Sequence, residues 1–100
     1  MNFTKTVLVD LIRNSKDQIT PMLLNWFCEH VVEPQLAEFV IDFESMTKRT
    51  LYIITNDNNS PYNIVFDQEK GAFGLSCTIS HSIEWYMGPY GSLIDTINNI

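Results

Sequence analysis

The chain has 100 residues, of which 45% are hydrophobic and 18% charged, and its twelve acidic and six basic residues give a net charge of -6. This length and composition exclude a second domain of ordinary size and a disordered chain, because the apolar residues suffice for one modest core. The acidic balance disfavours nucleic acid as a partner and favours a basic protein. The start of the chain lacks the apolar core of a secretory signal, and no apolar stretch is long enough to span a bilayer. We therefore expect a single cytoplasmic domain, residues 1–100, that makes no contact with membranes.

The first third of the chain has the apolar period of two helices. Apolar residues recur on one stripe between residues 3 and 18, and Thr20-Pro21 is a typical start for a second helix over residues 21–32. This second helix is apolar on most sides, which predicts that it packs between helix one and another layer. Pro34 disfavours helical geometry in the residue before it and is expected to help end the helix.

The period then changes from helical to alternating. Residues 36–45 (LAEFVIDFES) predict a strand with an apolar core face, formed by Ala37, Phe39, Ile41 and Phe43. Its other face carries Glu38, Val40, Asp42 and Glu44. A second strand is expected over residues 49–56 (RTLYIITN). A connection through Met46-Thr47-Lys48 would set Ile41 beside Ile53 and Phe43 beside Leu51, which aligns the two core faces.

Three more strands are expected in the second half of the chain, over residues 62–66, 72–80 and 82–87. The last of them places Ile83, Trp85 and Met87 inward. Gly88-Pro89-Tyr90-Gly91 then breaks the sheet, and Ser92, with Asp95 three residues later, predicts the cap of a short closing helix. The predicted fold class is α+β: two N-terminal helices, an antiparallel meander of about five strands with the helices on one face, and a short C-terminal helix.

Several chemically capable groups are present, but they form no catalytic or metal-binding set. His30 follows Cys28 closely, yet nothing completes a nucleophile, base and orienter, and no second histidine stands at metal spacing. His81 lies between two serines, although neighbouring residues of a strand point to opposite faces. Asp42 and Glu44 share a strand face, as paired carboxylates in metal or acid–base sites do, but further ligands are missing. We expect no enzyme activity, no catalytic residue, no metal and no cofactor, and we expect both cysteines to be reduced core thiols.

The acidic residues are concentrated in segments that contain no base. Five acids and no lysine or arginine lie between residues 29 and 44, and residues 71–100 contain two acids and again no base. With the helices on the Phe39 side, the opposite strand face would expose acids together with aromatic and aliphatic side chains, a mixture that suits a protein interface. The predicted partner-binding residues are Glu38, Asp42, Glu44, Tyr52 and Ile54. The alternative is that these acids only keep the protein soluble.

Two glycine-containing motifs stand in the last third of the chain. The first is Gly-x-Phe-Gly-Leu, at Gly71, Phe73, Gly74 and Leu75. The second is Gly-x-Tyr-Gly-Ser, at Gly88, Tyr90, Gly91 and Ser92. In this arrangement residues 70–100 resemble the ending of small bacterial immunity proteins from polymorphic-toxin and contact-dependent growth inhibition systems. The resemblance implies a non-catalytic antitoxin that binds and neutralises one cognate toxin, often a nuclease, and it carries over no binding residue.

Two other function classes stay open at this point. A secretion chaperone is also small, acidic and α+β, and it would form a homodimer that holds an extended segment of its client. A minor enzyme would instead use Asp42, Glu44 or His81.

Overall fold

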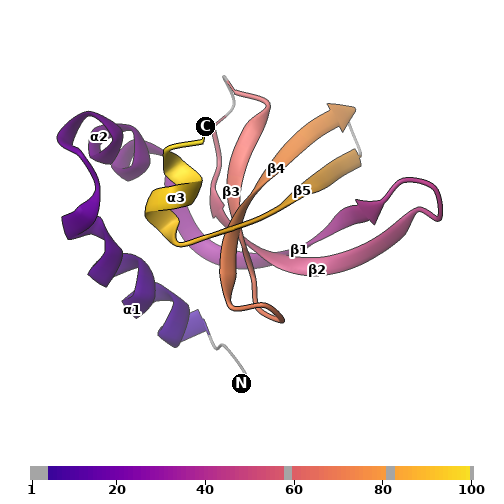
Figure 1. Cartoon of the computed structure of the whole chain (residues 1–100), viewed down its shortest axis with the longest axis horizontal. Helices are drawn as coiled ribbons and strands as arrows, with labels where there is room; N and C mark the ends of the chain where they lie inside the picture. The colour runs from indigo at the N-terminus through magenta and orange to yellow at the C-terminus, as the bar shows by residue number, and fades with distance from the viewer. Residues whose placement is uncertain (1–4, 58–59, 81–82, 100) are drawn as a thin grey trace.

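The computed structural model of the protein describes residues 5–57, 60–80 and 83–99 and shows an α+β fold (Figure 1). The helical elements that open the chain are α1 (Lys5–Ser15), the 3-10 turn η1 (Lys16–Gln18) and α2 (Pro21–His30). The strands are β1 (Val31–Asp42), β2 (Thr47–Thr55), β3 (Tyr62–Asp67), β4 (Ala72–Ser80) and β5 (Ile83–Gly91), and the last helix is α3 (Leu93–Ile97). Residues 3 and 4 of the first expected helix lie outside the described residues, as does His81.

Helix α2 begins where expected and ends two residues early. Pro21 occupies its first turn, and the backbone carbonyl of Thr20 accepts the first helical hydrogen bond, although the Thr20 hydroxyl makes no capping bond. The helix ends at His30 because the chain enters β1 at the next residue. The carbonyl of His30 accepts a hydrogen bond from the amide of Asn56 (2.9 Å). Pro34 is therefore a buried residue of a strand and not a helix terminator. None of the described helices is long and apolar enough to cross a membrane.

The five strands form a meander that closes into a barrel. Each strand pairs antiparallel with the next, and β5 meets β1 in parallel at one residue pair, Val40 with Trp85. We call this contact the seam. The expected meander is thus correct in its order and its antiparallel pairing, and the closure adds a feature that the sequence pattern did not predict.

The expected register of the first hairpin is wrong. Ile53 pairs with Gln35 and not with Ile41, and Leu51 pairs with Ala37 and not with Phe43. Each of these β2 residues therefore pairs with a β1 residue nearer the N-terminus than expected. The reason is the turn, which lies over residues 43–46 and places Met46 in the left-handed region at φ 54°. The displacement covers an even number of residues, so the same β2 residues still face the Phe39 side of β1.

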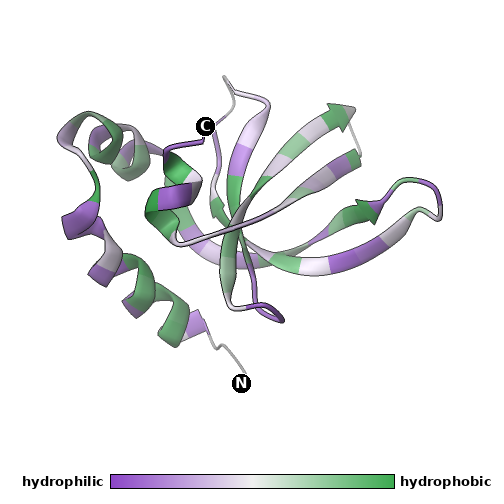
Figure 2. Ribbon diagram, viewed as in Figure 1, coloured by the Kyte–Doolittle hydropathy of each residue, from purple (hydrophilic) through white to green (hydrophobic). Residues whose placement is uncertain are grey.

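Residues 64–67 of β3 are buried on both faces of the curved sheet, which explains the continuous apolar run in this strand. The interior of the barrel holds the cluster Phe39, Leu51, Val65 and Tyr86. The outer face packs against the helices in a second cluster: Leu8, Ile12, Ile19, Phe27, Ile54, Ile64, Phe66, Phe73, Leu75, Leu93 and Ile97. Figure 2 shows the resulting alternation of hydrophobic and hydrophilic residues along the strands.

Strand β5 does not end at Met87 as expected. It continues through Gly88-Pro89-Tyr90 to Gly91, which pairs with Phe73, and a register shift absorbs the irregular backbone. Gly88 and Gly91 have φ values of 124° and 103°, which side-chain-bearing residues rarely adopt. The glycines bend the strand and do not break it.

The closing helix forms as expected. The Ser92 hydroxyl accepts a hydrogen bond from the Asp95 amide (3.1 Å). The buried residues of the helix are Leu93, Thr96 and Ile97. The expectation of two core thiols is wrong for Cys28, which is exposed on α2; both cysteines are free.

Candidate functional site

Large apolar side chains line up across the outer face of the barrel. The register pairs Tyr62 of β3 with Cys77 of β4, and Cys77 with Trp85 of β5. Directly paired residues of neighbouring strands project from the same face, so these three side chains form one row. Ile79 and Met87 lie two residues beyond Cys77 and Trp85 along their strands, each at an irregularity of the β4–β5 register, and Met87 packs against the outer cluster.

The helices leave this part of the outer face uncovered. Helix α3 packs on β4 and β5, and α1 packs on β1, while Figure 1 shows all three helices gathered at one end of the barrel. Tyr62 and Ile79 are accordingly 38% and 51% exposed, and Trp85 and Met87 are half-buried. A contiguous exposed apolar patch marks an interaction site more often than scattered exposed apolar residues do.

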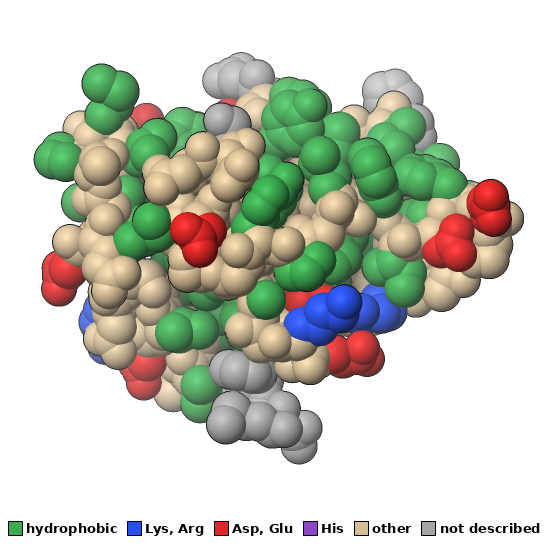
Figure 3. Space-filling view, viewed as in Figure 1, with side chains coloured by type: hydrophobic (Ala, Val, Ile, Leu, Met, Phe, Trp, Pro, Cys, Tyr) green, Lys and Arg blue, Asp and Glu red, His purple; other side chains and the backbone are tan. Residues whose placement is uncertain are grey.

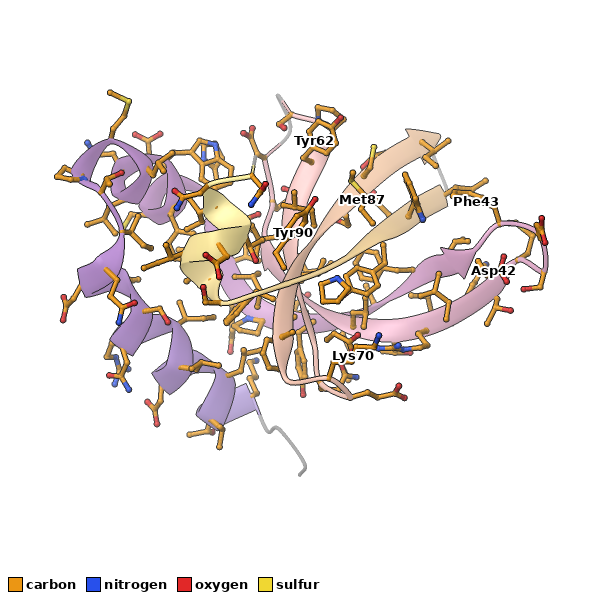
Figure 4. All side chains as sticks on the ribbon, viewed as in Figure 1. Asp42, Phe43, Tyr62, Lys70, Met87 and Tyr90 are labelled. Carbon is orange, nitrogen blue, oxygen red and sulfur yellow. The ribbon has the colours of Figure 1, made fainter. Side chains whose placement is uncertain are left out.

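Phe43 extends the patch across the seam between β5 and β1. Its ring centroid lies 5.5 Å from that of Trp85, with the planes tilted by 59°, a favourable geometry for aromatic pairs. Phe43 is still 41% exposed. Figure 4 shows Tyr62, Met87 and Phe43 along one margin of the barrel, with Lys70 near the opposite margin. We name these five residues the apolar surface: Phe43, Tyr62, Ile79, Trp85 and Met87.

Two carboxylates flank Phe43 at the tip of the first hairpin. Asp42 and Glu44 are both exposed, and Asp42 Oδ1 accepts a hydrogen bond from the Glu44 amide (3.0 Å), so this aspartate also orders the turn. The space-filling view shows acidic side chains at the far end of a run of hydrophobic ones (Figure 3). Negative charge beside aromatic side chains is typical of interfaces in which charge steers the encounter and apolar contacts stabilise the complex.

Glu38, the third predicted acid, lies apart from this group. It is exposed on β1, but it shares a shallow hollow with Lys48, Arg49 and Glu69. The neighbouring bases offset its charge, so the structure joins Asp42 and Glu44 with Phe43 and separates Glu38 from them.

The predicted exposure of Ile54 is wrong, and Tyr52 is only half-exposed. Ile54 is fully buried and Tyr52 packs against the same core cluster, while Val40 is also buried. These side chains project from the outer face, part of which the helices cover, whereas the sequence pattern suggested that the helices cover the face of Phe39. That second face is not exposed either, because it curls into the interior of the barrel.

The sequence pattern missed three members of the apolar surface by assigning them to the core. Alternation correctly placed Trp85 and Met87 on one face, and it placed Phe43 on the core side of its strand. Which part of a sheet face the helices reach is a tertiary property that alternation does not encode. The absence of lysine and arginine from residues 71–100 was the one signal pointing to this region.

His30 takes part in a tie between α2 and the segment that follows β2. Its Nδ1 bonds to the carbonyl of Trp26 (2.8 Å), and its Nε2 lies 3.5 Å from Asp57 Oδ1. The indole N–H of Trp26 donates to the other oxygen of Asp57 (3.1 Å). These contacts give His30 a structural part in joining α2 to the segment after β2. Within the described ranges, no three His, Cys, Asp or Glu side chains group as metal ligands would.

A buried ion pair occupies the barrel interior near the β3–β4 turn. Arg49 pairs with the fully buried Asp67 and lies 3.5 Å from Glu69, and Asp67 Oδ1 also accepts the amides of Glu69 (3.1 Å) and Lys70 (3.3 Å). Burial opposes a rise in the pKa of Arg49, but the hydrogen bond and charge of Asp67, with Glu69, raise that pKa overall. Burial and then the charge of Asp67 raise the pKa of Tyr86 to about 12. Asp67 thereby orders the β3–β4 turn.

Comparison of the chain with protein-family models, with curated proteins and with solved structures gives no match.

Proposed function

We propose that the protein is a non-enzymatic binding protein that seats a folded, basic protein partner on the apolar surface. The observation that carries the proposal is the cluster of aromatic and methionine side chains that the helices leave exposed, with Asp42 and Glu44 at one end. Aromatic residues and methionine are enriched in protein interfaces, and the strongest contacts come from anchors of this type.

Charge complementarity supports a basic partner. The chain has a net charge of -6, and the segment that contributes β4 and β5 contains no lysine or arginine. An acidic partner would be repelled, while a basic one would be drawn to the surface before the apolar contacts form.

The resemblance of residues 70–100 to immunity proteins gives this proposal its specific form. We propose that the partner is a bacterial toxin domain such as a nuclease, and that the protein neutralises it by tight binding. Three glycines of the two motifs, Gly71, Gly88 and Gly91, have positive φ values.

The test is co-purification of the tagged protein with the product of the gene immediately upstream, followed by expression of that product with and without the protein. We expect a one-to-one complex and rescue of growth. A homodimer that holds an extended client segment would instead favour the chaperone class, and the absence of both complex and toxicity would overturn the proposal.

Substitutions locate the contact. Trp85→Ala with Met87→Ala should weaken the complex at least tenfold, because removal of an interface anchor costs about 2 kcal/mol or more. Met22→Ala is the matched control, since Met22 is 83% exposed on α2, away from the apolar surface. Equal binding by the two variants would place the interface elsewhere.

A further inference from the structure

The barrel contains a cavity at one mouth, away from the buried ion pair. Its volume is about 330 Å³, which lies at the lower end of the range of small-ligand sites. The side chains deepest in the barrel are apolar: Ala37, Phe39, Ile53 and Val65. The lining also includes polar residues, among them Gln35, Thr55, Asn63 and Ser76. Barrel mouths are common ligand sites, and an apolar floor with a polar rim suits a ligand that has one apolar and one polar end.

The charge of the lining has one sign. Glu33 and Glu84 contribute carboxylates, and none of the described lining residues is a lysine, arginine or histidine. An anion would be repelled at this mouth. A wholly apolar ligand would remove water from the carboxylates and return no hydrogen bond to them.

The two carboxylates differ in whether a positive charge of the protein already neutralises them. Glu33 pairs with Lys5 (2.5 Å), and the hydrogen bond and charge of that lysine lower the pKa of Glu33. Glu84 accepts a hydrogen bond from the Thr78 hydroxyl (2.7 Å) and has no ion pair with any described residue. Glu84 is therefore the group with charge available for a ligand.

Glu84 also stands where the cavity meets the outside. Together with Asn56 and Asn63 it lines a second, shallower hollow that continues past Asp57, Pro61 and Thr78. Because the two hollows share Asn56, Asn63 and Glu84, a chain lying in the second hollow would lie next to the mouth of the cavity.

We propose that the barrel mouth binds an organic cation on an apolar stem, namely an alkylammonium group. The stem lies against Phe39, Ile53 and Val65, and the ammonium donates to the Glu84 carboxylate at the rim. This chemistry is shared by a lysine side chain of a bound polypeptide and by a free diamine. The site lies on the interior face of the barrel and does not depend on the proposed use of the outer apolar surface.

The test titrates the full, isotopically labelled chain with three probes while amide chemical shifts are recorded. N-acetyl-lysine amide represents a chain-borne lysine, cadaverine represents a free diamine, and N-acetyl-norleucine amide keeps the stem without the charge. We expect saturable shifts at Ile53, Thr55, Asn63 and Glu84 with at least one of the two cationic probes. The norleucine amide should bind at least about tenfold more weakly than the cationic probes, because a hydrogen bond to a charged group contributes about 1.5–3 kcal/mol.

Two isosteric variants complete the test. Glu84→Gln should weaken binding of the cationic probes about tenfold by removing the charge-assisted hydrogen bond, while Asp17→Asn removes the same charge at an exposed position of η1 and should leave affinity unchanged. Tighter binding of the lysine amide assigns the site to a polypeptide, and tighter binding of cadaverine assigns it to a free amine. The proposal is overturned if neither cation gives saturable shifts at the cavity, if norleucine binds as well, or if the two variants behave alike.

Discussion

At the scale of the residue, Tyr86 should contribute the clearest pH dependence to the free energy of unfolding. Its side chain is almost fully buried, and its hydroxyl has no hydrogen-bond partner among the described residues. Desolvation of this kind disfavours the tyrosinate form, and the nearby charge of Asp67 adds to the effect.

Alkaline pH should therefore destabilise the protein through Tyr86. An unfolded tyrosine loses its proton near pH 10, whereas the native pKa of Tyr86 is about 12. The native state holds more protons between these values, so the free energy of unfolding falls as pH rises through this window. Urea titrations below and above pH 10 measure the fall, which should be smaller in Tyr86→Phe than in wild type or in the control Tyr90→Phe. An unchanged slope in Tyr86→Phe would contradict the assignment.

Gly74 occupies a position where no side chain fits. A Cβ added there would lie 2.4 Å from the carbonyl oxygen of Gly88 and 2.8 Å from a ring carbon of Tyr86. Because one obstacle is backbone, we expect Gly74→Ala to lower the free energy of unfolding by about 1–3 kcal/mol, as overpacking does. Chemical denaturation checks this value. Thr50→Ala, at an exposed position of β2, is the control and should stay within about 0.5 kcal/mol of wild type.

At the scale of the element, side-chain contacts with the loop after β2 help to hold α2 in place. The bond from the Trp26 indole to the nearly buried carboxylate of Asp57 is the central contact. Trp26→Phe keeps an aromatic ring and removes the donor, so we expect a loss of about 1–3 kcal/mol in the free energy of unfolding. Trp85→Phe is a matched control, because its indole has no hydrogen bond to a described residue. Similar losses in the two variants would show that ring size, and not the hydrogen bond, explains the effect.

The elements differ in how far local sequence determines them. Residues 72–80 alternate cleanly and form β4 with the predicted bounds, and Ser92 caps α3 as its local motif requires. The junction between α2 and β1 was not predicted, because residues 31 and 32 continue the apolar helical pattern but belong to β1 in the structure. The hairpin register was missed for a similar reason: the left-handed backbone at Met46, which is not a glycine, leaves no typical turn signal.

The candidate site was harder to predict than the fold. Asp42 and Glu44 were predicted as partner-binding residues from their charge and their shared strand face, but exposure of Phe43, Trp85 and Met87 depends on where the helices end over the sheet. The cavity residues come from all five strands and from Asn56 beside β2, and only closure of the barrel brings Glu33 and Glu84 to one mouth.

At the scale of the whole molecule, the distribution of charge should control the rate of partner binding. Asp42→Lys with Glu44→Lys should slow association with a basic partner about tenfold at low salt and less at high salt, because exposed charges are screened. Asp17→Lys with Glu29→Lys changes the net charge equally at exposed positions of the helical end. Association kinetics across a salt series compare the two pairs. Equal slowing would show that only the net charge matters.

The seam between β1 and β5 also has a consequence for how the chain folds. Every other strand pairing joins neighbours along the chain, whereas Val40 and Trp85 come from opposite ends of the meander and share one residue pair. Contacts between distant segments cost the most loop-closure entropy, and this one returns little backbone hydrogen bonding in exchange. We expect the hairpins to form first and the barrel to close last, so an incompletely folded chain presents an open sheet that is apolar on both sides. Such an intermediate is the form of this protein most exposed to aggregation during synthesis.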